Sequence, residues 1–223
     1  MAEAELKCAM FDLDGTLLDS MYVWRRVDDL FLGRRNIALP DDYVKAISPM
    51  TVRQSAEYTI ARFKLNETSE QLIEEWNALA LREYAENVQL KPGAYDYIAA
   101  LKDAGVKICT MSTLDVKLAR PALERCGILA FIDTMYTADR HALGKARPES
   151  YVKAALDIGV KSVQCAMYDD LAYALKAAHD AGMYTVGVHD PMAADAPHDV
   201  CDRFIFDFTK EFEDMAVRFG VHM

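Results

Sequence analysis

The sequence is poor in three features that mark particular classes of protein: paired cysteines, long apolar runs and positive charge. Its five cysteines are an odd number, lie far apart and form no Cys-x-x-Cys pair. We therefore expect buried free thiols in a reducing compartment rather than disulfides or a zinc site. No uninterrupted apolar run reaches the length of a membrane-spanning helix. The formal net charge of −10 argues against non-specific binding to nucleic acid or an anionic membrane, although a local metal can still attract a small anion.

The first residues are acidic, whereas a secretion signal begins with basic residues. Together with the lack of an apolar span, this predicts a cytoplasmic protein. The expected partner is a small molecule rather than a nucleic acid or a membrane.

What is present is typical of a globular α/β protein. Hydrophobic residues make up 52% and charged residues 27% of the 223 residues, enough for one full core and a small second unit. Strands are predicted at residues 7–11, 106–111, 163–168, 184–188 and 204–206, with a short strand or turn at 131–137. Helices are predicted between them at 94–104, 116–126, 149–157 and 172–181, and a last one at 210–219. This alternation predicts βαβ units and a parallel sheet.

Residues 20–87 interrupt the alternation directly after the first strand. They show helical spacing from residue 24 to about 33, at 43–47, at 52–63 and at 69–87, and no convincing strand. We therefore expect an α/β core from residues 1–19 and 88–223, with a small helical bundle of residues 20–87 inserted between them.

Two carboxylates follow the first predicted strand. Asp12 and Asp14 are two residues apart, so they lie on the same side if the strand continues, and Gly15 lets the chain leave the strand abruptly. Such close carboxylates repel one another unless a cation or a proton intervenes, and oxygen ligands of this kind suit Mg²⁺. A carboxylate can also act as a covalent nucleophile. The alternative is a solvated turn, for which this composition is common.

Three further places carry polar groups beside predicted strands or helices. Ser112 and Thr113 end the second strand and could hold a phosphate or merely begin a turn. Lys145 lies just before a helix, with Arg147 as a competing cation; a lone loop lysine is usually a surface charge. Asp169 and Asp170 follow the strand at 163–168, where adjacent acids are costly without a cation but are also common at helix starts.

These four segments, taken in order, resemble the four motifs of the haloacid dehalogenase-like hydrolase superfamily. Residues 12–20 resemble the first motif in its phosphatase form, and Ser112 matches the second. Lys145 with Pro148 and Tyr151 resembles the third, although Ala146 replaces a common proline. Asp169 and Asp170 resemble the fourth when counted back from Gly182-Met183. Leu171 and Ala174 depart there from the usual serine and glycine.

The resemblance implies a Rossmann-like core, a mobile helical cap and Mg²⁺-dependent hydrolysis of a small phosphomonoester, such as a sugar phosphate or nucleotide. It implies that Asp12 attacks phosphorus and that Asp14 acts as general acid and base. Ser112 and Lys145 then hold the phosphoryl group, with help from Thr113. The implied metal ligands are Asp12, the backbone carbonyl of Asp14, Asp170 and Asp169.

Asp14 argues for phosphate chemistry rather than dehalogenation, because a dehalogenase has no leaving oxygen to protonate. Two alternatives stay open: a phosphosugar mutase of the β-phosphoglucomutase type, and an idle protein that binds a phosphorylated ligand. In the helical insert, Trp24 and Arg53 are candidates to contact the substrate. Packing within the insert is the favoured interpretation of Trp24, and a surface position is an equal alternative for Arg53.

Overall fold

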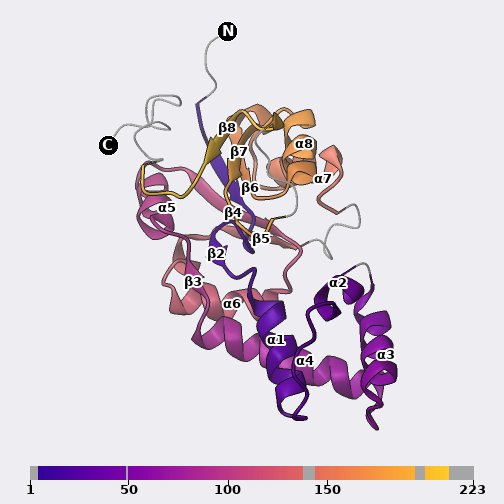
Figure 1. Ribbon diagram of the computed structural model, residues 1–223. Coiled ribbons are helices and arrows are strands. Elements are labelled where there is room, and N and C mark those ends of the chain that lie inside the picture. The colour runs from indigo at the N-terminus through magenta and orange to yellow at the C-terminus, as the bar shows by residue number, and fades with distance from the viewer. Residues whose placement is uncertain (1–4, 49, 138–143, 194–198, 211–223) are drawn as a thin grey trace. The chain divides into compact units, whose positions relative to one another are not determined.

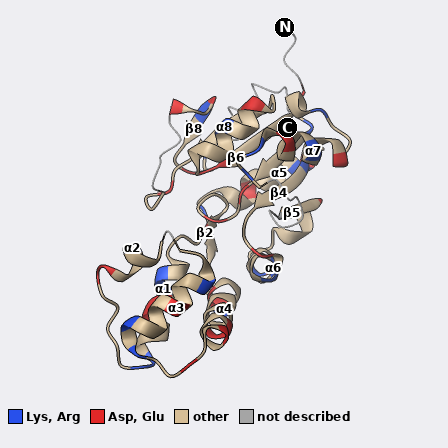
Figure 2. Ribbon diagram, turned by 90° about the vertical axis from the view of Figure 1, so that its right-hand side faces the viewer, with Lys and Arg blue, Asp and Glu red and all other residues tan. Residues whose placement is uncertain are grey.

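The computed structural model describes residues 5–48, 50–137, 144–193 and 199–210. The chain divides into two compact units, one formed by Met1–Met21 with Val88–Met223 and the other by Tyr22–Asn87. The first unit is a sheet with helices around it, and the second is a group of helices (Figure 1). Acidic and basic residues are spread along both units (Figure 2). No helix of the described ranges combines the length and the apolar character needed to cross a lipid bilayer.

The sheet of the first unit has six strands in the order β5-β4-β1-β6-β7-β8, and every pair in it is parallel. Its strands are β1 (Cys8–Phe11), β4 (Lys107–Ser112), β5 (Thr134–Thr137), β6 (Cys165–Asp169), β7 (Tyr184–Val188) and β8 (Arg203–Ile205). The chain begins in the middle, runs to the β5 edge, and then returns to the other side of β1. The direction in which successive strands are added therefore reverses between β1 and β6. Open α/β sheets bind their ligands at such a point.

Helices cover both faces of this sheet. They are α5 (Ala94–Asp103), α6 (Val116–Arg125), α7 (Pro148–Asp157) and α8 (Ala172–Asp180), with short 3₁₀ turns η1 (Leu129–Phe131) and η2 (Ser162–Gln164). On one face Cys8 and Met10 pack in a buried cluster with residues of α7 and α8. On the other face Phe11 stacks on Tyr168 at 4.5 Å and meets Tyr97 of α5 edge-on at 6.3 Å. Because both faces are covered, β1 is apolar throughout rather than alternating.

The second unit contains α1 (Val23–Gly33), α2 (Tyr43–Ile47), α3 (Val52–Phe63) and α4 (Ser69–Glu86). Two of these helices begin with the same local signal: Thr51 and Thr68 each form a capping box with the glutamine three residues later. Helix α1 packs against α4, with the rings of Phe31 and Trp76 5.6 Å apart. The prediction of an α/β fold with a parallel sheet and a helical region is confirmed.

The structure corrects two details of the predicted elements. Val163 is not in a strand: it lies in η2 and is 56% exposed, and β6 begins at Cys165. Two short strands were not predicted, β2 (Leu18–Asp19) and β3 (Gln89–Leu90), which pair antiparallel next to the two boundaries of the helical unit. The predicted helix at 210–219 lies almost wholly outside the described residues.

The five cysteines are free thiols, as expected, and the three on strands are buried. Cys8, Cys109 and Cys165 lie on β1, β4 and β6. The reducing compartment stays a prediction.

Candidate active site

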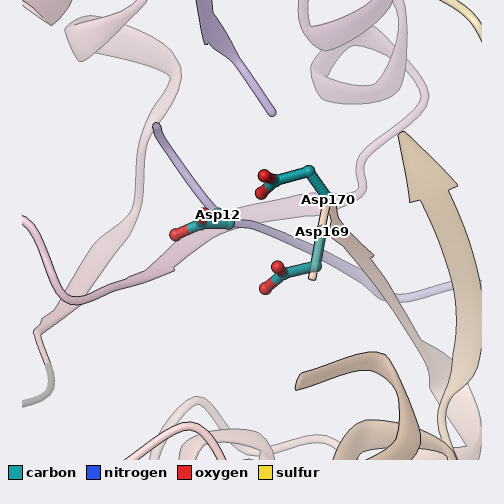
Figure 3. A group of neighbouring side chains, drawn as sticks. All are labelled: Asp12, Asp169 and Asp170. Carbon is teal, nitrogen blue, oxygen red and sulfur yellow. The ribbon is translucent and has the colours of Figure 1, made fainter. Parts of the chain in front are cut away.

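Three buried carboxylates meet at the carboxyl ends of β1 and β6. Asp12 directly follows β1, Asp169 is the last residue of β6, and Asp170 comes next. Each offers a carboxylate oxygen, and these oxygens lie within 4.8 Å of one another. Figure 3 shows the three side chains gathered beside the two strands from which they come. The parallel register explains the meeting, because Phe11 pairs with Tyr168, which places Asp12 opposite Asp169.

The loop after β1 is held by backbone hydrogen bonds. The N–H of Asp12 donates to the carbonyl of Tyr168 at 2.9 Å, which extends the pairing with β6 by one residue. The chain then turns back, and the N–H groups of Thr16 and Leu18 both donate to the carbonyl of Leu13, at 3.2 and 2.8 Å. Asp12 is only 4% exposed, so its carboxylate is largely shielded from solvent.

Asp14 lies in the same loop but has a different environment. Its side chain is half-buried, and Oδ1 accepts a hydrogen bond from Ser20 Oγ at 2.5 Å. Its carboxylate is not part of the buried cluster of three. The carboxyl of Asp14 is thus oriented by a hydrogen bond and stays partly accessible to solvent.

Gly15 is required by the site for two separate reasons. Its φ of +78° lies in the left-handed region that favours glycine. A Cβ on this residue would also lie 2.6 Å from Oδ2 of Asp170, far inside van der Waals contact. The first loop therefore approaches Asp170 as closely as only glycine allows.

The ammonium of Lys145 neutralises part of the negative charge of the three buried carboxylates. Lys145 precedes α7, and its Nζ lies 3.0 Å from Oδ1 of Asp12 and 2.6 Å from Oδ2 of Asp169. Its side chain is 2% exposed, whereas the competing cation Arg147 is exposed. Lys145 is therefore not a surface charge.

The loop that carries Lys145 is secured from α7 even though Ala146 stands where proline is common. Ser150 Oγ donates to the carbonyl of Gly144 at 2.7 Å, and the hydroxyl of Tyr151 donates to the carbonyl of Lys145 at 3.0 Å. These two bonds hold the backbone of the two residues that directly precede Ala146.

Burial and mutual charge shift the pKa values of these groups. Burial is the main cause that raises the pKa of Asp169 to about 8, and that of Asp170 to about 7, with the charge of Asp12 adding to both. Burial alone would lower the pKa of Lys145, but Asp12 and Asp169 outweigh it, so its pKa is raised and it stays charged. The cluster therefore favours the arrival of further positive charge.

The cluster fits a divalent cation on two counts. Oδ2 of Asp170 is buried and has no hydrogen-bond partner among the described residues, while Oδ1 accepts from Thr16 Oγ1 at 3.3 Å. Three carboxylates also face a single ammonium, and a hard divalent ion bound by oxygen ligands would balance the excess. Asp169 is different. Its Oδ2 also lacks a hydrogen bond of ordinary geometry but forms an ion pair with Lys145 at 2.6 Å, and its Oδ1 accepts the N–H of Leu171 at 3.0 Å.

The remaining candidates of the first unit lie at the end of β4, the other neighbour of β1. Ser112 is 2% exposed, and its Oγ accepts the N–H of Leu114 at 3.2 Å. Thr113 is exposed. Both therefore lie at the carboxyl edge of the sheet that also carries the acidic cluster.

The two candidates in the helical unit are both on its surface. The favoured interpretation of Trp24 as a packed residue is wrong, because its side chain is 47% exposed and Trp76 is the tryptophan buried in this unit. Both are aromatic residues at helical spacing, so the sequence does not tell them apart. Arg53 is exposed at the start of α3 and forms an ion pair with Glu70 at 2.9 Å.

Sequence reasoning gave no role to two residues that the structure places at the site. Thr16 and Ser20 hydrogen-bond Asp170 and Asp14, and their place in the first motif was a signal that could have found them.

Comparison with known proteins agrees with this geometry. The chain is 26% identical over 190 residues to validoxylamine A 7′-phosphate phosphatase from Streptomyces hygroscopicus subsp. limoneus, covering 85% of this chain and 89% of that one. It is 25% identical over 201 residues to hexitol phosphatase B from Escherichia coli (strain K12), covering 86% and 88%.

The fold is also known from solved structures. A Thermotoga maritima protein, to which β-phosphoglucomutase activity is provisionally assigned, matches with a TM-score of 0.84 and 16% identity over 95% of this chain and 99% of that one. The model of the haloacid dehalogenase-like hydrolases matches residues 6–182, which include every acidic residue of the site and Lys145. The chain belongs to the haloacid dehalogenase-like hydrolase family.

Proposed function

We propose that the protein is a Mg²⁺-dependent phosphomonoester hydrolase that works through a phosphorylated Asp12. The observation that carries this proposal is the buried cluster of three carboxylates and one ammonium at the point where the strand order reverses. The names of the two relatives, phosphatases of a hexitol and of validoxylamine A 7′-phosphate, support a small phosphorylated polyol or sugar as the substrate class. A nucleotide is the alternative.

Asp12 is the nucleophile in this proposal. Its buried carboxylate is aligned by Lys145 and by the backbone pairing with β6. It attacks phosphorus, and the bond between phosphorus and the leaving oxygen breaks as the bond to Asp12 forms. The ammonium of Lys145 then offsets the repulsion between the carboxylate and the phosphoryl oxygens.

Asp14 moves the protons. It gives its proton to the leaving alcohol and, in the second step, takes a proton from the water that attacks the phosphorylated Asp12. Free phosphate leaves, and both side chains return to their starting states. The hydrogen bond from Ser20 orients the carboxyl of Asp14.

The cation would be held by Asp12, Asp170 and, as the family resemblance implies, the backbone carbonyl of Asp14. When bound, it supplies positive charge that stabilises the phosphoryl oxygens as they react. The unpartnered oxygen of Asp170 supports its role as a direct ligand. Asp169, whose oxygens are already engaged, holds Lys145 and adds charge to the site.

Ser112 and Lys145 hold the phosphoryl oxygens, with the exposed Thr113 as an additional donor. In this proposal the helical unit, which we propose spans residues 20–87, is a cap that carries substrate contacts such as Trp24 and Arg53. The phosphosugar mutase stays an alternative, since a fold likeness at 16% identity does not transfer an activity.

The test is hydrolysis of p-nitrophenyl phosphate and of a panel of polyol, sugar and nucleotide phosphates, with Mg²⁺ and with EDTA. The Asp12→Asn variant should lose turnover in all of them, and Asp103→Asn, which alters an exposed aspartate at the end of α5, should keep it. Turnover that persists in Asp12→Asn would overturn the assignment of Asp12 as the nucleophile. Failure to release phosphate, together with isomerisation of a sugar phosphate, would favour the mutase.

A further inference from the structure

A second buried ion pair lies in the first unit, outside the residues given a role above. Lys91 Nζ lies 2.7 Å from Oδ2 of Asp190, and the two side chains are 8% and 2% exposed. Lys91 Nζ also donates to the carbonyl of His189 at 3.1 Å, and Oδ1 of Asp190 accepts the N–H of Met192 at 2.8 Å. Two buried charges thus compensate each other. Removing one partner would leave the other as an uncompensated buried charge.

Asp190 belongs to the same edge of the sheet as the acidic cluster. It follows β7, and β7 pairs with β6 so that Gly187 lies opposite Asp169. The charge of Asp190 also reaches Asp170: after burial and the charge of Asp12, it is a further cause that raises the pKa of Asp170. The strand order therefore places a fourth acid at the same edge of the sheet as the proposed cation ligands.

Lys91 comes to this edge from the other connection of the chain. It directly follows β3, and its backbone N–H donates to the carbonyl of Leu17 at 2.8 Å, in the loop after β1. Thr16 of that loop donates to Asp170. Lys91 therefore joins the loop after β1, by its backbone, to the loop after β7, by its side chain.

We propose that the Lys91–Asp190 pair tunes the charge of the cation site by keeping Asp190 neutralised at the sheet edge that also carries Asp170. This inference rests on the proposed function, because it concerns the cation that the cluster would bind. Without Lys91, the carboxylate of Asp190 adds negative charge near the cation. Without Asp190, the ammonium of Lys91 repels the cation.

The two removals should therefore change cation affinity in opposite directions. A pair that only braces the two loops makes a different prediction, because losing either partner would then disturb the site and weaken binding. The sign of the change separates the two roles.

The experiment is a titration of the full chain with Mn²⁺, following the electron paramagnetic resonance signal of the free ion, with Mg²⁺ as competitor and no substrate. Lys91→Met should bind about threefold more tightly or better, and Asp190→Asn about threefold more weakly or worse, since a unit charge acts on a divalent ion over several ångströms even through a high dielectric. The double variant should return close to the unaltered chain, as should Lys91→Arg. Asp103→Asn is the control for removing an exposed charge.

Melting temperatures in EDTA identify any variant that does not fold. If one single variant does not fold, the cation affinity of the double variant is compared with that of the remaining single variant. The direction of that difference tests the same prediction. Weaker binding in both single variants, with no recovery in the double, would show a brace and overturn the inference. Binding by the unaltered chain with no opposed shifts would contradict this inference alone, whereas no binding by the unaltered chain would contradict the proposed function as well.

Discussion

The ammonium of Lys145 lies 3.0 Å from Oδ1 of Asp12, and both side chains are buried. This contact joins the loop before α7 to the end of β1, two segments far apart in the sequence. It also means that the proposed nucleophile never stands as an isolated buried anion.

Removing the ammonium should cost most of the activity. Lys145→Met leaves Asp12 and Asp169 without their shared cation, so we expect kcat to fall about 100-fold or more, as when a main charge-stabilising donor is removed. Arg147→Gln, two residues away and exposed, should change kcat little. The measurement is steady-state hydrolysis of p-nitrophenyl phosphate at saturating Mg²⁺. Equal losses in the two variants would show that general loop charge, rather than Lys145 itself, matters.

Gly15→Ala should impair the site beyond its effect on stability. The added Cβ would lie 2.6 Å from Oδ2 of Asp170, and the φ of +78° would strain the backbone of the alanine. Gly105→Ala is the matched control, because its φ is +80° but a Cβ there meets nothing within 4 Å. Both variants should lose about 1 kcal/mol of unfolding free energy from backbone strain.

Only Gly15→Ala should lose cation affinity and turnover, measured by Mn²⁺ titration and p-nitrophenol release. If Gly105→Ala lost them to the same extent, the close approach to Asp170 would not be the cause.

The helical unit should become less stable as pH rises from about 4 toward neutrality. Asp28 on α1 is 7% exposed, and burial raises its pKa to about 7. The unfolded chain releases this proton near pH 4, whereas the folded unit keeps it until about pH 7. The stabilisation from the retained proton is therefore complete below about pH 4 and is lost as pH rises toward 7, after which stability is flat.

Between pH 5 and pH 8 this loss should be roughly 2 to 3 kcal/mol, and Asp28→Asn should abolish it. Both tryptophans, Trp24 and Trp76, lie in the helical unit, so urea unfolding followed by tryptophan fluorescence reports on this unit. A variant that keeps the full slope would assign the pH dependence to another group.

Much of the fold could be predicted because local signals agree with the final structure. The strand at 184–188 and the helix at 52–63 are found at the predicted residues, and the Thr51 capping box begins that helix. Val163 was misplaced because an apolar residue next to a strand looks the same whether it enters the sheet or turns outward. Strands β2 and β3, which pair Leu18 with Leu90, are two residues long each. They are too short to produce a periodic pattern in the sequence.

The sequence predicted which residues form the candidate site but not which contacts each of them makes. Motif spacing alone pointed to Asp169 and Asp170 as a pair of acids. Only the structure shows that Asp169 is engaged by Lys145 while Asp170 keeps an unpartnered oxygen. The pairing of Lys91 with Asp190 spans 99 residues, so it follows from the strand order rather than from any local signal.

The most direct test of the account is to trap the phosphorylated enzyme. The protein is mixed with p-nitrophenyl phosphate and Mg²⁺, quenched in acid during turnover and digested, and the peptide that contains residues 12–20 is analysed by mass spectrometry. We expect one added phosphoryl group on Asp12, absent with EDTA and in Asp12→Asn. Mg²⁺-dependent turnover with the phosphoryl group on Asp14, or on neither residue under conditions that preserve acyl phosphates, would contradict the account.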